Sequence, residues 1–129
     1  MGAPGTGTPY VDGFVMAVPT AGTQAFTDYA RTFDTIFMEF GATRIIEALA
    51  DDVPDGTVTD FRKAVQATSD ETVGFSWVEY PDKATRDAGM KKMMEDPRMD
   101  PANPDNPPMP FDGKRMIYGG FQPVVVLKK

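Results

Sequence analysis

The sequence predicts an α+β protein of the ferredoxin-like class, with the element order β-α-β-β-α-β and a four-stranded antiparallel sheet covered on one face by two helices. The chain has 129 residues, of which 41% are hydrophobic and 25% charged, and this suits one soluble core. Apolar residues recur with helical spacing in two segments. Runs rich in β-branched and aromatic residues, which are typical of strands, lie around them.

The first half of the chain predicts a strand, a helix and a second strand. Residues 10–18 are rich in β-branched and aromatic side chains, and Pro19 ends this strand. A helix follows, because apolar residues recur at i, i+3, i+4 and i+7 until Gly41. Residues 43–50 form the second strand. The apolar positions of the helix are Phe26, Tyr29, Ala30, Phe33, Ile36, Phe37 and Phe40.

The second half begins with turn residues and then repeats the pattern. Residues 62–67 are ambiguous between a short strand and a helical turn. Residues 73–80 (VGFSWVEY) form the third strand. Residues 83–95 form the second helix, for which Asp82 is the expected N-cap and Pro97 the stop.

A proline-rich loop separates the second helix from the last strand. Six of the 12 prolines lie between Pro97 and Pro110, so residues 98–110 form a stiff loop without regular structure. Asp112 and Gly113 form a turn in which the glycine can adopt positive φ. The last strand is then predicted over residues 115–127.

The predicted strands are apolar on both faces. Consecutive apolar residues occupy positions 14–16 and 124–127, a pattern expected where both faces of a sheet are buried. The two helices cover one face only. A second copy, packed sheet against sheet, is the simplest cover for the other face, so we expect a homodimer with an interface of roughly 2,000 Å² or more.

The N-terminal residues predict no targeting signal. Residues 1–9 contain neither a basic segment nor an apolar core, so we expect a flexible leader followed by one domain over residues 10–129. No apolar run approaches the roughly 20 residues that span a bilayer. We therefore expect a cytoplasmic protein without a membrane partner.

Composition excludes several classes of chemistry. The net charge of -6 disfavours nucleic-acid binding, which depends on lysine and arginine neutralising phosphates. The chain contains no cysteine and no histidine. Disulfides, Cys/His zinc sites, His-ligated haem and the Ser-His-Asp triad are thereby excluded. We expect no cofactor and no bound metal, and any proton transfer must use a carboxylate, lysine, tyrosine or water.

Two segments approach known motifs without completing them. DDVPDG at 51–56 resembles a calcium loop, but Val53 and Arg62 stand where oxygen ligands are required, so an acidic turn is the better interpretation. Residues 74–78 begin like a nucleophile elbow but end in valine. No histidine exists to activate Ser76, so this segment is predicted to be a core strand.

The stretch MPFDGKRMIYGGF at 109–121 carries the most specific pattern. Adjacent Gly119 and Gly120 in a strand indicate a bulge or a close backbone approach, and we expect a bend beside the dimer seam. Arg115 should be held by a carboxylate or a ligand anion. Asp12 is the first choice, because the first and last strands are neighbours in this topology. Alternatively, Arg115 and Tyr118 rim a cleft.

Several segments together resemble a known family. They are YVDGF at 10–14, FGA at 40–42, DDVPDGTVTDF at 51–61, DETVGFSWVEY at 70–80, DPRM at 96–99 and the stretch at 109–121. Nearly everything from residue 10 to residue 127 resembles the small bacterial proteins known as domain of unknown function 1428, within the dimeric α+β barrel superfamily. This resemblance implies a ferredoxin-like protomer and a dimer of facing sheets, with no established activity. The superfamily includes monooxygenases, lactone isomerases and haem-degrading enzymes, but several of these use a histidine that is absent here.

Two functional hypotheses remain open. The first is a cofactor-independent enzyme, monooxygenase- or isomerase-like, acting on a small organic molecule in a cleft between sheet and helices. The second is a non-catalytic dimer that binds a metabolite or a protein. No catalytic residue is assigned. Trp77 is either a pocket wall or part of the core or dimer seam. The candidate pocket residues are Tyr10, Asp12, Trp77, Tyr80, Arg115 and Tyr118.

Overall fold

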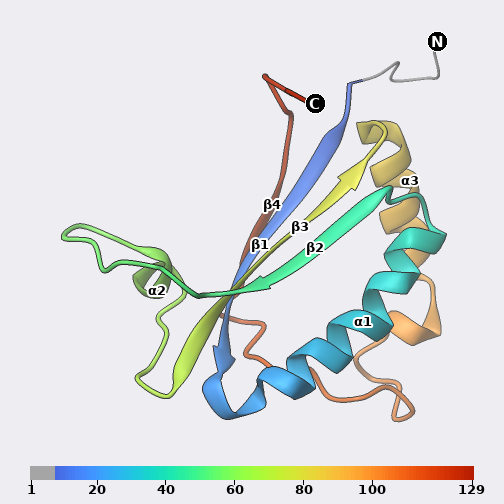
Figure 1. Ribbon diagram of the computed structural model, residues 1–129. Coiled ribbons are helices and arrows are strands. Elements are labelled where there is room, and N and C mark those ends of the chain that lie inside the picture. The colour runs from blue at the N-terminus through green and yellow to red at the C-terminus, as the bar shows by residue number, and fades with distance from the viewer. Residues whose placement is uncertain (1–7) are drawn as a thin grey trace.

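The computed structural model describes residues 8–129 and confirms the ferredoxin-like architecture, with two long helices on one face of a four-stranded antiparallel sheet (Figure 1). Residues 1–7 of the predicted leader lie outside the described residues. No helix in the described part is long and apolar enough to cross a bilayer. The elements are β1 (Tyr10–Pro19), α1 (Thr23–Glu39), β2 (Arg44–Leu49), α2 (Phe61–Ala64), β3 (Glu71–Tyr80), α3 (Lys83–Met94) and β4 (Ile117–Phe121).

The sheet has the strand order β2-β3-β1-β4, so the two longest strands lie at its centre. β1 and β3 pair along their whole length, starting with Tyr10 opposite Tyr80. β4 pairs with the other edge of β1, with Val11 opposite Phe121. Because successive side chains alternate between the faces of a sheet, this register divides the strand residues between a helix-facing side and an open side.

The helix-facing side holds the main core. Met16, Val18 and Phe26 are at most 3% exposed and pack together between β1 and α1. α3 approaches α1 closely because Gly89 has no side chain. A β-carbon at Gly89 would lie 2.3 Å from the carbonyl oxygen of Phe40, so the crossing of the two helices depends on this glycine.

The helix ends follow the signals in the sequence. Asp82 caps α3 as predicted, because its Oδ1 accepts a hydrogen bond of 2.7 Å from the backbone N–H of Thr85. Gly41 follows α1 with a φ of 118°, a conformation that glycine adopts without steric cost. The ambiguous residues 62–67 begin as a helical turn, α2, capped by Asp60.

The open side of the sheet presents large apolar side chains to solvent. Phe75 is 40% exposed, Ile117 47% and Phe121 62%. Val65, which follows α2, packs with Ala17 against one end of this side. The sheet is therefore apolar on both faces, as the sequence indicated. Both long helices lie on the face opposite the open side (Figure 1).

The predicted last strand, residues 115–127, is too long at both ends. β4 begins at Ile117 and ends at Phe121. Pro123, which has no backbone N–H, follows almost at once and disfavours further pairing. The apolar side chains of residues 124–127 are between 56% and 92% exposed. The prediction that this run is part of a strand was therefore wrong.

Candidate functional site

Three of the six predicted pocket residues, Tyr10, Asp12 and Tyr80, gather on the helix-facing side near α3. The Asp12 carboxylate pairs with Arg86, whose Nη2 lies 2.9 Å from Oδ1, and the guanidinium lies 5.3 Å from the centroid of the Tyr10 ring. The Tyr80 hydroxyl is buried and has no hydrogen-bond partner among residues 8–129. Burial, with the nearby Asp12 carboxylate, raises the pKa of Tyr80 to about 12. Because its charges are paired, this cluster is a structural ion pair.

The other three predicted pocket residues lie elsewhere. Trp77 is on the open side of the sheet and donates from Nε1 to Glu79 at 2.8 Å. Tyr118 is 72% exposed on the edge strand β4 and stacks on Phe14. Arg115 lies in the turn before β4. The six residues are thus distributed over both faces of the sheet, and the structure does not bring them together.

Arg115 is held by carboxylates, but Asp12 is not one of them. Its two terminal nitrogens bind both oxygens of Glu71, at 2.8 and 2.7 Å, and its Nε donates to Asp112 at 2.9 Å. Nη1 also donates to the carbonyl oxygen of Gln66 at 2.8 Å. This clamp joins the segment after α2, the start of β3 and the turn before β4. The choice of Asp12 was wrong because β4 pairs Asp12 with Gly120.

The predicted bend at Gly119 and Gly120 is also wrong. The two glycines pair in unbroken register with Gly13 and Asp12 of β1. The alternative, a close approach, is what the structure has at Gly120. A β-carbon there would lie 2.3 Å from the Tyr10 hydroxyl.

Asp112 and Gly113 form the expected turn, but not through positive φ. Asp112 Oδ1 accepts a hydrogen bond of 2.9 Å from the backbone N–H of Lys114. Gly113 is not among the described glycines with positive φ. Its small size matters instead, because a β-carbon there would lie 3.1 Å from the sulfur of Met109.

Arg115→Met should lower the melting temperature markedly at neutral pH. The Arg115 guanidinium, helped by the Thr68 backbone N–H, lowers the pKa of Glu71 from 4.5 to about 2. A depressed carboxyl pKa stabilises the folded state above the ordinary pKa, and this contribution disappears as the pH falls towards 2. The difference between wild type and variant should therefore be full above about pH 5 and shrink in acid. Thermal melts at several pH values measure it, with Lys114→Met as the control; equal melting temperatures at pH 7 would contradict the clamp.

A cavity of about 170 Å³ lies between α1, the helix-facing side of the sheet and the proline-rich loop. Its wall is mostly apolar and rich in aromatic rings and methionines. Methionine is flexible and fills irregular spaces, so such a wall can adapt to different occupants. The wall residues include Phe26, Tyr29, Phe33 and Phe37 from α1, Met16 from β1, Met99 and Met109 from the loop, and Phe111 and Met116 from the segment between the loop and β4.

Three polar side chains interrupt this wall: Asp34 of α1, Glu47 of β2 and Ser76 of β3. Ser76 is only 3% exposed and lies on the side of β3 that faces the helices. Asp34 and Glu47 form a side-chain hydrogen bond with each other. Burial, with this bond and the Glu47 charge, raises the pKa of Asp34 to about 8, so the pair keeps one proton near neutral pH.

The Asp34–Glu47 pair stands between the cavity and the surface. Both side chains also line a second, outer groove, which includes Thr27, Arg31 and Leu49. The pair therefore contacts the cavity on one side and a solvent-exposed groove on the other. This position suits exchange of a proton between water and a molecule in the cavity.

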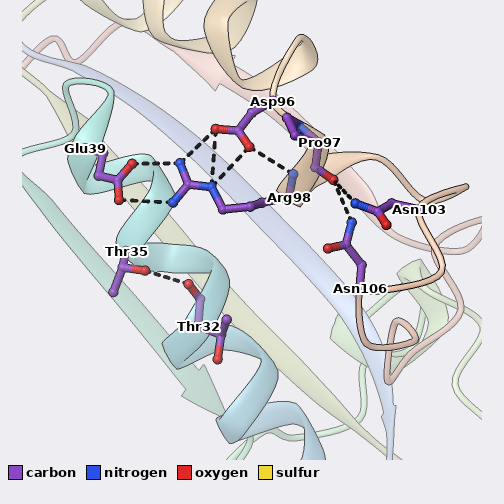
Figure 2. Close-up of polar contacts among 8 residues, drawn as sticks. All are labelled: Thr32, Thr35, Glu39, Asp96, Pro97, Arg98, Asn103 and Asn106. Atoms are coloured by element: carbon purple, nitrogen blue, oxygen red, sulfur yellow. Dashed lines mark hydrogen bonds and ion pairs between the residues drawn. The ribbon is translucent and has the colours of Figure 1, made fainter.

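The proline-rich loop forms one wall of the cavity and is held by polar contacts (Figure 2). Arg98 binds Glu39 at the end of α1, with distances of 2.7 and 3.1 Å, and also binds Asp96. The side-chain amides of Asn103 and Asn106 each donate to the carbonyl oxygen of Pro97 at 2.9 Å. These exposed contacts fix the start of the loop against α1.

This cavity was not predicted from the sequence, although two of its residues carried a signal. Asp34 lies within the apolar stripe of α1, four residues after Ala30 and three before Phe37, where a core residue is expected. Ser76 lies on the side of its strand that faces the core, between Gly74 and Val78, where an apolar side chain is expected. Glu47 carried no comparable signal. Within residues 8–129, no three or more acidic side chains gather as a metal site.

Comparison with known proteins identifies close relatives. The family model described as a protein of unknown function (DUF1428) matches residues 9–113. The uncharacterised protein YbaA of Escherichia coli strain K12 is 56% identical over 116 residues, which cover 90% of this chain and 97% of YbaA. The uncharacterised YbaA of Shigella flexneri has the same identity and coverage.

A solved structure supports the fold. It is described as a dimeric ferredoxin-like protein from an uncultured marine organism, and superposes with a TM-score of 0.50 at 11% sequence identity. The match covers 94% of this chain and 99% of that chain. At this identity the likeness shows the fold alone.

Proposed function

This chain belongs to the DUF1428 family of proteins of unknown function, and we propose that it binds a compact, mostly apolar organic molecule in the cavity between α1, the sheet and the proline-rich loop. The family resemblance seen in the sequence is thereby confirmed, and it brings no activity with it. The cytoplasmic location stays a prediction.

The observation that carries this proposal is a mostly apolar cavity into which three polar side chains, Asp34, Glu47 and Ser76, converge. Ser76 is 3% exposed and lines this cavity, where its hydroxyl can form a hydrogen bond with a polar group of a bound molecule. Ligand sites commonly combine an apolar wall with a few polar groups in this way.

The volume limits the ligand. A cavity of about 150 Å³ lined by apolar side chains accommodates one benzene molecule. The cavity here measures about 170 Å³, so it suits a single six-membered ring or a short branched chain. The polar groups lie together on one side, which favours a ligand with one hydrogen-bonding group.

A homodimer is part of the proposal. The open side of the sheet supports it through exposed apolar side chains, and the structural relative is described as dimeric. The ligand cavity lies on the opposite side of the sheet and is lined by side chains of one protomer. Binding and dimerisation can therefore be tested separately.

Cyclohexanone should bind in the cavity, as followed by amide shifts in ¹H–¹⁵N NMR spectra. The largest shifts should fall on α1, β3 and the proline-rich loop. Ser76→Ala removes one hydrogen bond and should weaken binding about two- to tenfold. Ala30→Leu fills the cavity and should abolish cyclohexanone binding. Thr35→Ala, on the exposed side of α1, should leave this binding unchanged. If the filled variant binds as well as wild type, the molecule does not bind in this cavity.

A further inference from the structure

We propose that the Asp34–Glu47 pair moves protons to and from a compact carbonyl compound bound in the cavity, at the carbon next to its carbonyl group. This inference rests on the proposed function, because the compound must first bind in the cavity. It assigns an acid–base role to two residues of α1 and β2, and a class of substrate to the site.

The geometry brings the three polar groups to one side of the cavity. Glu47 of β2 lies directly opposite Ser76 of β3 in the sheet register, and Asp34 of α1 forms a hydrogen bond with Glu47. The remaining wall is mostly apolar. A ligand that places its carbonyl oxygen near Ser76 therefore brings its neighbouring carbon near the carboxyl pair.

The pair can act as a base because its two carboxyl groups hold only one proton between them. Two carboxyl groups joined by a hydrogen bond do not ionise together, so one proton stays and one carboxylate oxygen can accept another. The charged and titratable groups around the pair are few. Arg31 of α1 lines the outer groove, Tyr29 of α1 lines the cavity, β3 contributes the neutral Ser76, and the loop contributes apolar side chains.

The proton transfer needs no further reactant. The carboxylate takes a proton from the carbon next to the carbonyl group, and the electron pair of that C–H bond forms the carbon–carbon double bond of an enolate. The enolate oxygen gains the negative charge and accepts a hydrogen bond from the Ser76 hydroxyl. The pair, now holding two protons, returns one to the same carbon or to another carbon of the conjugated system. Nothing is oxidised or reduced.

The position of the pair makes this transfer measurable as isotope exchange. Because Asp34 and Glu47 also line the outer groove, the pair can exchange its protons with water. In D₂O, the protons next to the carbonyl group of a bound ketone should therefore be replaced by deuterium. Cyclohexanone suits the cavity volume and serves as the probe.

The experiment follows the loss of these protons by ¹H NMR, with the wild-type protein in D₂O near neutral pD. Exchange should be faster than in the same buffer containing an equal concentration of acetate. Glu47→Gln and Asp34→Asn should each slow the protein-dependent exchange about a hundredfold, the order expected for loss of a general base. Asp105→Asn, which removes an exposed carboxylate of the proline-rich loop, should leave it unchanged.

The binding titration separates the possible failures. Cyclohexanone that binds in the cavity without faster exchange would overturn this inference and leave the proposed function intact. No binding would overturn both. The acid–base role would also be overturned if the Glu47→Gln protein exchanged the cyclohexanone protons at the wild-type rate. Glu47 is exposed and glutamine has the same shape, so this variant keeps the fold that the comparison needs.

Discussion

Asp12→Ala should lower the free energy of unfolding by roughly 3 kcal/mol, a large part of the stability of a protein this size. Asp12 is 3% exposed, and its carboxylate accepts hydrogen bonds from Arg86 at distances of 2.9–3.2 Å. Removing one partner of a buried ion pair leaves the other charge in place without compensation. The side chain of Arg86 is 24% exposed and also binds Asp87, which places the effect at the lower end of the expected range.

Urea unfolding at pH 7 measures this change. Asp87→Ala removes the exposed partner of the same arginine and should have a much smaller effect, because exposed ion pairs contribute little. The double variant Asp12→Ala with Arg86→Met should recover part of the loss, since no unpaired charge remains. Equal effects of the two single aspartate variants would show that burial of the Asp12 pair does not determine its contribution.

Periodicity explains why much of the fold could be predicted. The apolar spacing of α1 and the strand composition of β1 and β3 are local properties, and their bounds were correct to within a few residues. β4 was placed less well. Four consecutive apolar residues after Pro123 resemble a strand, but they are exposed and lie outside the sheet.

Register explains the error over Arg115. The prediction that β1 and β4 are neighbours was correct. Residues of neighbouring strands, however, contact each other only where the register places them side by side. Asp12 pairs with Gly120, five residues beyond Arg115, which corresponds to about 17 Å along a strand. Glu71 lies opposite Pro19, at the far end of β1, where the turn before β4 arrives. Local sequence patterns do not specify this long-range match.

The cavity could not be predicted because a loop builds one of its walls. Met99, Met109, Phe111 and Met116 come from a segment without periodic structure, and their return over α1 depends on individual contacts such as the Arg98–Glu39 ion pair. The specific stretch at 109–121 thus supplies cavity wall, clamp and edge strand together. The composition of this stretch indicated that it has a specific role, but it did not distinguish among these three roles.

Phe121→Asp should convert a dimer into a monomer while the fold stays intact. The open side of the sheet forms a concave apolar surface over β1, β3 and β4, and Phe75, Ile117 and Phe121 are between 40% and 62% exposed on it. Exposed apolar surfaces of this kind mark association sites. Phe121 is the most exposed of the three, so aspartate there costs the monomer little.

The physical reason for the size of the effect is symmetry. A two-fold interface buries each substituted residue twice, so one substitution places two unpaired carboxylates between the sheets. If each unpaired carboxylate costs about 2 kcal/mol or more of binding free energy, the dissociation constant of the dimer should rise roughly a thousandfold. Light scattering after size exclusion at about 10 μM measures the change, and Thr35→Asp, on the exposed surface of α1, is the matched control. If wild type is monomeric, or if Phe121→Asp stays dimeric, the open side of the sheet is not the dimer interface and the exposed apolar side chains there must serve another partner.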